Sequence, residues 1–184
     1  MKSTELSKYN YQGYSTQRSI IIRFLWYLIN YSIFKSPFCL GSFIKRFLLR
    51  LFGAKVGKGV VIKPRVNIKY PWFLSIGDNC WIGEEVWIDN LVEVKIGNNC
   101  CISQRALIET GNHNYSYSDF RLSPQSIILE DGVWICASSI VVSGTICKSH
   151  SVLCVGSVSP KIMDAYSIYK GNPAVKVKNR VIND

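Results

Sequence analysis

The chain has 184 residues, of which 48% are hydrophobic, and a formal net charge of +10 at neutral pH. It is long enough to bury a core without disulfides or metals. Its seven cysteines are an odd number and show no Cys-x-x-Cys or histidine-containing ligand spacing, which makes them a poor disulfide scaffold. We therefore expect reduced cysteines, a cytoplasmic protein and no metal site. The basic residues are spread through the chain and form no nucleic-acid-binding motif. A phosphate-rich cofactor, an acidic or diphosphate-linked saccharide and a solvated surface fit the charge as well, and the charge alone does not choose among them.

Residues 1–17 form a polar N-terminal tail, and the segment 18–54 differs sharply from it. Apolar stretches lie on either side of Pro37, and basic residues interrupt both of them. Each stretch is shorter than the roughly 20 apolar residues that cross a bilayer as a helix. We predict that 18–54 is an α-helical cap over the open end of the domain that follows. The alternative is that residues 18–52 lie partly on a membrane surface.

An aliphatic residue, or in one case a cysteine, recurs every six positions through most of residues 55–160. A strand buries every second residue and a helix follows a period of 3.6, so neither explains this spacing, whereas a coil of three short flat strands per turn does. We predict an all-β parallel β-helix rather than an antiparallel sandwich, in which longer strands would alternate. The repeating residues are Val56, Ile62, Ile68, Ile76, Ile82, Ile88, Ile96, Ile102, Ile108, Leu129, Ile135, Val141, Cys147 and Leu153.

The repeat slips at three places. The steps from Ile68 to Ile76 and from Ile88 to Ile96 are two residues too long, which predicts bulges or wider corners. The step from Ile108 to Leu129 is 21 residues, which predicts an inserted loop at about 109–128. Loops of this length in compact domains are usually functional or disordered, and this one holds one of only two histidines. Beyond the repeats, we expect residues 161–184 to form a C-terminal tail.

Several strings in the chain resemble the hexapeptide-repeat acyltransferases, and within them the acetyltransferases of colanic acid, capsular and exopolysaccharide biosynthesis. The strings are LLRLFGA at 48–54, YPW at 70–72, IGDNCWIGEEVWIDN at 76–90, CISQ at 101–104, TGNHNY at 110–115, DGVWI at 131–135, GSV at 156–158 and GNPA at 171–174. The resemblance covers roughly residues 18–181. It implies a left-handed coil and a homotrimer whose active sites lie between neighbouring subunits.

The chemistry that the resemblance implies is O-acetylation, in which a sugar hydroxyl attacks the thioester of acetyl-CoA. His113 matches the catalytic histidine of the family and would act as the general base. Glu85 would orient the imidazole or accept hydrogen bonds from the sugar, and it is the second predicted catalytic residue. Acceptor contacts are predicted for Asn90, Trp87 and Tyr115, although the neighbouring carboxylates could equally be a solvated face and Trp87 a subunit contact.

For acetyl-CoA, the resemblance points to the later coils. The pantetheine groove is predicted at Trp134, Ala137, Gly156 and Ser157, and phosphate contacts at Lys161, Lys178 and Arg180. Departures from the family pattern lie nearby: Cys136, Lys148 and Cys154 stand where glycine is usual, and Asn114 follows His113 where an acidic residue is common. The other histidine, His150, falls at a repeat corner and is expected to be an exposed turn residue.

Four other classes share the coil or its chemistry. A small-molecule acetyltransferase acting on an antibiotic or a free sugar would use the same histidine, and a non-catalytic β-helix interaction protein would need none. A carbonic anhydrase of the gamma type needs three histidine ligands, which two histidines cannot supply. A sugar nucleotidyltransferase needs a further nucleotide-binding domain, for which the chain has no room. The expected location is the cytoplasm, with the inner face of the membrane as the alternative site of action.

Overall fold

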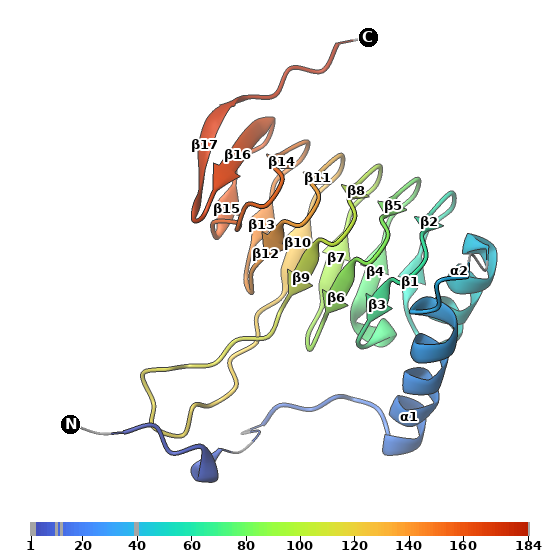
Figure 1. Ribbon diagram of the computed structural model, residues 1–184, viewed down its shortest axis with the longest axis vertical. Helices are drawn as coiled ribbons and strands as arrows, with labels where there is room; N and C mark the ends of the chain where they lie inside the picture. The colour runs from blue at the N-terminus through green and yellow to red at the C-terminus, as the bar shows by residue number, and fades with distance from the viewer. Residues whose placement is uncertain (1–2, 10, 12, 39–40, 184) are drawn as a thin grey trace.

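The structure is a computed structural model that describes residues 3–9, 11, 13–38 and 41–183. Its main body is a coil of short strands stacked into three sheets (Figure 1). Sheet A contains β1 (Lys55–Val56), β4 (Leu74–Ile76), β7 (Val94–Ile96), β10 (Ile127–Leu129), β13 (Ile146–Cys147) and β15 (Ile162–Met163). Sheet B contains β2 (Val61–Ile62), β5 (Trp81–Ile82), β8 (Cys101–Ile102), β11 (Trp134–Ile135), β14 (Val152–Leu153), β16 (Ser167–Gly171) and β17 (Ala174–Asn179). Sheet C contains β3 (Asn67–Ile68), β6 (Trp87–Asp89), β9 (Leu107–Glu109) and β12 (Ile140–Val141).

The predicted repeat residues line the inside of this coil. All of them except Val56 are buried, and each pairs in register with the repeat residue one turn away, as Ile68 does with Ile88 and Ile88 with Ile108. Each turn therefore covers the apolar floor of the next, which is how a solenoid builds one continuous core from short strands. The predicted left-handed parallel β-helix is confirmed.

The strands meet at three edges, which we name after the sheets that they join. The A/B edge includes Asn79, Asn99, Gly132 and His150, the B/C edge includes Arg65, Glu85, Arg105 and Ser138, and the C/A edge includes Tyr70, Asn90, Thr110 and Ser143. Glycine is needed where turns stack closely, because a Cβ on Gly77 would lie 2.7 Å from the carbonyl group of Gly97. The B/C edge instead places charged side chains in the left-handed region, with φ of 57°, 59° and 60° at Arg65, Glu85 and Arg105.

Two helices cover the first turn of the coil, where β1, β2 and β3 are the end strands of their sheets. Helix α1 (Ile20–Ile29) continues into a π-helical turn, η2 (Asn30–Phe34), and helix α2 (Ser42–Leu51) follows. The buried Trp26 donates its indole N–H to the carbonyl oxygen of Ile68 at 2.8 Å, and Lys45 donates from Nζ to the carbonyl oxygen of Lys63 at 2.7 Å. The helices thus supply donors to carbonyl groups that the coil leaves unpaired at its open end.

The long step in the repeat leaves the coil as predicted, between Glu109 at the end of β9 and Ile127 at the start of β10. We name residues 110–126 the excursion. Figure 1 shows it extending away from the sheets toward the N-terminal segment, whose short 3-10 helix η1 (Leu6–Lys8) lies close to it. The backbone N–H of Glu5 donates to the carbonyl oxygen of Ser118 at 2.7 Å. The step from Ile68 to Ile76 contains another 3-10 turn, η3 (Pro71–Phe73), which widens that corner.

The C-terminal residues differ from the predicted tail. β15 and β16 continue sheets A and B, and β17 folds back antiparallel on β16. Met163 is buried, and so is Tyr169 six residues later. The core of the coil therefore continues with a thioether and an aromatic ring in place of aliphatic residues. The hairpin pairs the backbone groups of β16, and β17 becomes the edge strand of sheet B.

Two of the free cysteines should resist alkylation. Burial raises the pKa of the Cys147 thiol to about 12 and that of Cys136 to about 11. The protonated thiol, which is unreactive, dominates below these values, so about a thousandth or less of either is thiolate at pH 8. We expect iodoacetamide at pH 8 to leave both unmodified in the native protein and to alkylate both in urea, as measured by peptide mass spectrometry. Equal labelling of Cys147 in the two conditions would contradict its burial.

Candidate active site

His113 lies near the start of the excursion, directly beyond the C/A edge. Its backbone bridges Leu122 on the returning strand of the excursion, and its backbone N–H donates to Oδ1 of Asn112 at 2.8 Å. The imidazole stacks on the Phe120 ring with 4.3 Å between the ring centroids and an angle of 9° between the planes. The local fold of the excursion therefore fixes both the position and the plane of the ring.

The hydrogen bond at Nδ1 determines the tautomer of His113. Nδ1 lies 2.8 Å from the carbonyl oxygen of Phe120. A carbonyl oxygen can only accept, so in the neutral ring Nδ1 carries the hydrogen and Nε2 keeps its lone pair. The sequence predicts a carboxylate for this orienting role, whereas the structure uses a backbone carbonyl seven residues away in the same loop. Nε2 is thereby left as the basic atom of the ring.

A column of charged residues at the end of sheet C lies beside His113. Lys69, Asp89 and Glu109 follow the stacked core residues Ile68, Ile88 and Ile108, and Nζ of Lys69 lies 2.8 Å from Oδ1 of Asp89. Together with His113, Tyr115 and Lys161 they line a cleft of about 620 Å³. Asp89 and Glu109 were not predicted. Their signal in the sequence is that each is the residue after an isoleucine of the repeat, one turn apart.

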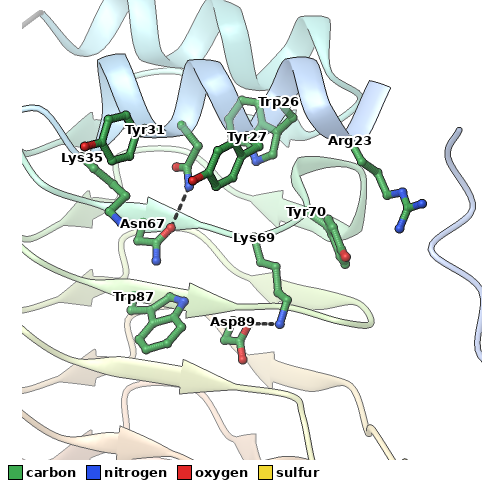
Figure 2. A pocket seen from close by; sticks show the side chains of 11 residues that line it. Arg23, Trp26, Tyr27, Tyr31, Lys35, Asn67, Lys69, Tyr70, Trp87 and Asp89 are labelled. Atoms are coloured by element: carbon green, nitrogen blue, oxygen red, sulfur yellow. Dashed lines mark hydrogen bonds and ion pairs between the residues drawn. The ribbon is translucent and has the colours of Figure 1, made fainter. Parts of the chain in front are cut away.

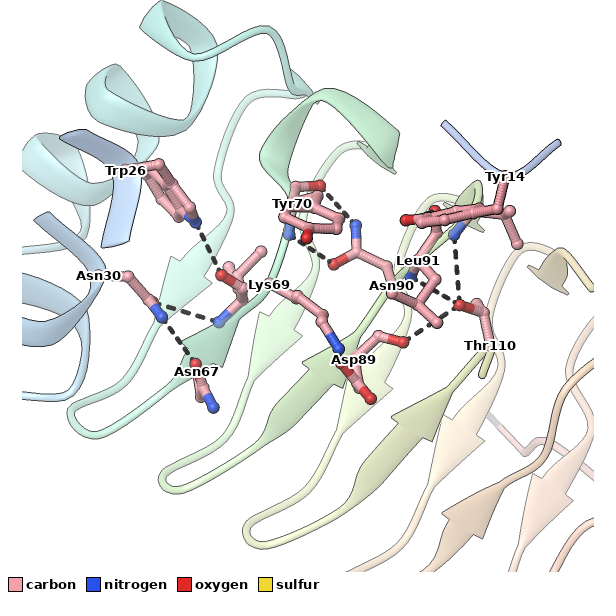
Figure 3. A network of polar contacts seen from close by, with 12 residues as sticks. Tyr14, Trp26, Asn30, Asn67, Lys69, Tyr70, Asp89, Asn90, Leu91 and Thr110 are labelled. Atoms are coloured by element: carbon pink, nitrogen blue, oxygen red, sulfur yellow. Dashed lines mark hydrogen bonds and ion pairs between the residues drawn. The ribbon is translucent and has the colours of Figure 1, made fainter. Parts of the chain in front are cut away.

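Buried polar residues of the C/A edge hold the ends of the excursion in place, and Figure 3 shows the contacts of one of them, Thr110. The hydroxyl of Thr110 accepts from the backbone N–H of Leu91 at 2.8 Å and donates to the carbonyl oxygen of Asp89 at 3.1 Å. The hydroxyl of Ser143 donates to the carbonyl oxygen of Thr110 at 2.8 Å and accepts from the N–H of Gln125 at 3.0 Å. Both ends of the excursion are therefore tied to the coil, which limits how far His113 can move.

Asn90 belongs to this buried network rather than to a binding surface. The sequence predicts an acceptor contact for it, but its side chain is fully buried. Its amide accepts from the N–H of Tyr70 at 3.0 Å and donates to the carbonyl oxygen of the same residue at 2.6 Å. Because these bonds close the wide corner that contains η3, Asn90 offers no surface to an acceptor in this structure.

A second cleft, of about 360 Å³, lies between helix α1 and sheet C (Figure 2). Lys69 and Asp89 line both clefts, so the two meet at this ion pair. The predicted acceptor residue Trp87 projects into the second cleft from β6 and is 47% exposed. The remaining lining is aromatic and basic, from Arg23, Tyr27, Tyr31, Lys35 and Tyr70 among others. Tyr115, also a predicted acceptor residue, is 84% exposed and lines the His113 cleft.

Glu85 lies at the B/C edge, across sheet C from His113. Its carboxylate pairs with Nε of Arg105 at 2.7 Å and with a guanidinium nitrogen of Arg65 at 3.0 Å. The hydrogen bond from Arg105, and to a smaller extent that from Arg65, holds the pKa of this carboxyl below its usual range. Within one chain Glu85 does not reach the imidazole, because Glu85 turns the chain after β5 at the B/C edge, whereas the excursion leaves the coil after β9 at the C/A edge. A role of Glu85 in a site between two copies stays a prediction.

The predicted cofactor residues are distributed over sheet B and all three edges. Trp134 projects from sheet B and donates from its indole nitrogen to the hydroxyl of Ser103 at 2.9 Å. Ala137 and Gly156 stack at the B/C edge, where the N–H of Gly156 donates to the carbonyl oxygen of Ala137 at 3.0 Å. A Cβ at Gly156 would meet no atom within 4 Å, so this backbone borders open space. Ser157 beside it is buried, and its hydroxyl accepts from the N–H of Gly171 at 3.0 Å.

The three residues predicted to contact the phosphates also lie at different parts of the coil. Lys161 lies at the C/A edge, where its Nζ donates to the carbonyl oxygen of Ser143 and it lines the His113 cleft. Lys178 is exposed on β17. Arg180 lies at the A/B edge, where it donates to the carbonyl oxygens of Gly132 at 3.0 Å and His150 at 3.1 Å. Of the predicted cofactor residues, the structure therefore brings only Lys161 to the histidine within one chain.

A coil of six-residue repeats with a histidine presented on an excursion from one edge defines a protein of the hexapeptide-repeat acyltransferase class. No protein-family model matches the chain. It is 37% identical over 158 residues, 85% of this chain and 86% of the relative, to the "Putative colanic acid biosynthesis acetyltransferase WcaF" of Escherichia coli (strain K12), and equally to the protein of that name in Shigella flexneri. The chain belongs to the family of hexapeptide-repeat acetyltransferases that includes these relatives, and the resemblance found in the sequence is confirmed.

Solved structures share the fold. A hexapeptide-repeat-containing acetyltransferase from Vibrio cholerae superimposes with a TM-score of 0.79 at 20% identity, covering 86% of this chain and 90% of that chain. The Vibrio protein has also been solved with acetyl-CoA, with a TM-score of 0.79 at 19% identity, covering 88% of each chain. A maltose O-acetyltransferase from Clostridium difficile 630 has a TM-score of 0.75 at 17% identity, covering 89% of this chain and 90% of that chain.

Proposed function

We propose that this acetyltransferase moves an acetyl group from acetyl-CoA to a sugar hydroxyl during surface-polysaccharide biosynthesis, with His113 as the general base. The observation that carries the proposal is the Nδ1 hydrogen bond to Phe120, because it leaves the lone pair on Nε2 of a ring that lines a cleft. The relatives named for colanic acid biosynthesis support the substrate class. We place the reaction in the cytoplasm, where thiols stay reduced, because the cysteines that the structure describes are free.

The proposed step is direct acyl transfer. Nε2 of His113 accepts the proton of the acceptor hydroxyl as the hydroxyl oxygen forms a bond to the acyl carbon. The bond from that carbon to the thioester sulfur breaks, and the sulfur leaves as the thiolate of coenzyme A, which takes up a proton. Asp89 and Glu109 line the same cleft as the imidazole.

The second cleft suits a saccharide acceptor. Sugar rings present apolar C–H faces that pack on aromatic side chains, and Trp87, Tyr70 and Tyr27 supply such surfaces. Lys35 and Lys69 add positive charge for an acidic sugar or a diphosphate. Because this cleft meets the His113 cleft at Lys69 and Asp89, a saccharide lying along both could present a hydroxyl to Nε2.

A homotrimer completes the proposed site. The backbone at Ala137 and Gly156 lies at the B/C edge, whereas His113 lies at the C/A edge, so sheet C separates them within one chain. In a threefold assembly of prism-shaped chains, an edge of one copy faces an edge of the next. The pantetheine arm would then lie between copies, with Lys161 beside the histidine, while Trp134, Ser157, Lys178 and Arg180 stay predictions for contacts with the rest of the cofactor.

An acceptor panel tests the proposal. Purified protein is incubated with acetyl-CoA and either nucleotide sugars, lipid-linked oligosaccharides, free sugars or chloramphenicol, and thiol release and the mass gain of each acceptor are followed. We expect acetylation of a nucleotide-linked or lipid-linked saccharide and little of the free compounds. Faster turnover of a free sugar or of chloramphenicol would favour a small-molecule acetyltransferase. Absence of transfer to any acceptor would favour a non-catalytic interaction protein.

A further inference from the structure

The two helices that cover the first turn of the coil turn an apolar surface away from it. This surface, which we name the cap face, consists of residues that are 46–73% exposed: Ile20, Ile21, Phe24, Leu25, Leu28, Phe43, Phe47 and Leu51. Figure 1 shows α1 and α2 at the end of the coil, with the strands on one side and no other described element on the far side. An apolar surface of this composition on a water-soluble protein indicates an interaction site.

Helix α2 turns basic residues toward the coil and leaves large apolar residues exposed on its outer side. Its basic residues face the coil: Lys45 is fully buried against the carbonyl oxygen of Lys63, and Arg46 and Arg50 donate to the carbonyl oxygens of Val60 and Val56 at 2.6–2.9 Å. Leu49 is buried beside Lys45, whereas the two phenylalanines face outward, with Phe43 and Phe47 73% and 57% exposed. A surface helix of a globular protein normally buries the apolar face and exposes the charged one, so the outward face of α2 is built for apolar surroundings.

Helix α1 has no polar face at all. Between Ile20 and Ile29 the one charged residue is Arg23, and the one buried residue is Trp26. The indole of Trp26 donates a hydrogen bond to the carbonyl oxygen of Ile68, and Ile29 also packs against the core. The remaining aliphatic and aromatic side chains make the helix far more apolar than packing on β3 requires.

We propose that the cap face docks on the surface of a bilayer that contains anionic lipids. Helices that lie in the membrane interface present large aliphatic and aromatic residues to the acyl chains and hold basic residues near the headgroups. Here Arg18 precedes α1 and Lys35 follows η2, both exposed, and the whole chain carries a net charge of +10. Among the residues that the structure describes, no helix is long and apolar enough to cross a membrane.

Charge complementarity with an anionic leaflet makes lipid the proposed occupant of the cap face. The chain carries a net charge of +10, and the exposed Arg18 and Lys35 flank α1 and its continuation. An anionic leaflet attracts this charge. The donors of Lys45, Arg46 and Arg50 are already used on the coil, so insertion of the outward face would not bury them anew.

Docking would also place the second cleft at the membrane surface. Arg23, Tyr27, Tyr31 and Lys35 of α1 and its continuation line that cleft, so it opens beside the cap face (Figure 2). A saccharide attached to a membrane lipid through phosphate could then enter the cleft from the headgroup region. This consequence rests on the proposed function, whereas docking itself does not.

Vesicle flotation without substrates tests the docking. Full-length protein is mixed with vesicles of phosphatidylcholine alone or of phosphatidylcholine with phosphatidylglycerol, and bound protein is recovered from the floating fraction. We expect binding to the anionic vesicles, weaker binding to phosphatidylcholine, and a decrease with added salt. The double variant Phe24→Asn/Phe47→Asn should reduce the apparent affinity for anionic vesicles by about tenfold or more.

The matched control is Val175→Asn/Val177→Asn, which changes two exposed apolar residues on β17 at the other end of the chain. It should float like the natural protein, and circular dichroism should give unchanged melting curves for both double variants. Natural protein that stays in the aqueous fraction with both vesicle types would overturn the proposal. Flotation of the Phe24→Asn/Phe47→Asn variant equal to that of the natural protein would also overturn it. If the natural protein does not float and light scattering shows that this variant has lost a subunit contact, the cap face is an interface between copies and the proposal is wrong. Because no substrate is present, failure here would leave the proposed acetyl transfer standing.

Discussion

Replacing His113 by asparagine should lower kcat for acetyl transfer by about 10²–10⁴-fold, the usual contribution of a positioned general base. The amide cannot accept the hydroxyl proton, although it is short enough to fit beside Phe120 and keeps a hydrogen-bonding group there. We expect KM for acetyl-CoA to change little, because the proposed cofactor contacts are made by residues other than His113, among them Ala137, Gly156 and Lys161. Steady-state kinetics with acetyl-CoA and the acceptor identified from the panel measure both values.

His150→Asn is the matched control, because His150 is the other histidine of the chain. It lies at the A/B edge with φ of 60°, a conformation that asparagine tolerates, and its ring packs on Tyr166 with 4.7 Å between centroids. Its activity should equal that of the natural protein. Full activity of His113→Asn, or equal losses in the two variants, would remove His113 as the base while leaving the fold and the family intact.

Replacing Trp26 by alanine should destabilise the protein by about 3–5 kcal/mol, as expected for loss of a buried aromatic side chain. Trp26 is 2% exposed and packs against Phe34 and Phe52 with ring centroids 5.2 and 5.3 Å away. The substitution leaves a cavity between α1 and the coil and removes the donor to the carbonyl oxygen of Ile68. Urea unfolding followed by circular dichroism measures the change in free energy of unfolding.

Two variants separate packing from the hydrogen bond. Trp26→Phe keeps a ring in the core but loses the indole N–H. We expect it to lower the free energy of unfolding by about 1–3 kcal/mol, because the carbonyl oxygen of Ile68 loses its donor. Tyr27 lies on the same helix with its side chain exposed. The Tyr27→Ala substitution should change the free energy of unfolding by less than about 0.5 kcal/mol. A Trp26→Ala protein as stable as Tyr27→Ala would show that α1 does not contribute to the folded core.

Sequence reasoning reached the fold because the signal is local and repeated. Each isoleucine from Ile62 to Ile108 is buried beneath the next turn, so each one independently indicates the coil. A wrong prediction at one corner therefore does not affect the prediction for the other turns. It also located the excursion, because a break in a strict period is visible without knowing where the chain goes. It stopped one turn too early at the C-terminus, since Met163 and Tyr169 fill the core without being aliphatic.

The site was harder to derive, because its geometry depends on which edge each residue reaches. Glu85 and Asp89 are four residues apart, yet Glu85 turns at the B/C edge toward Arg65 and Arg105 while Asp89 reaches the cleft of His113. The orienting group of the imidazole is a backbone carbonyl, which leaves no mark in the residue types of a sequence. Asn90 was predicted to face an acceptor, but the wide corner at η3 turns it inward to Tyr70.

By itself the amino-acid sequence determined that this chain is a hexapeptide coil with helices before it, that its repeat breaks once for a long loop, and that a histidine lies in that loop. These follow from periodicity and composition, which act within a few residues. Only the tertiary structure decided which nitrogen of His113 stays basic, which carboxylates accompany it, and that α2 turns its basic residues inward. Those outcomes depend on contacts between residues far apart along the chain, and no local pattern specifies where such residues meet.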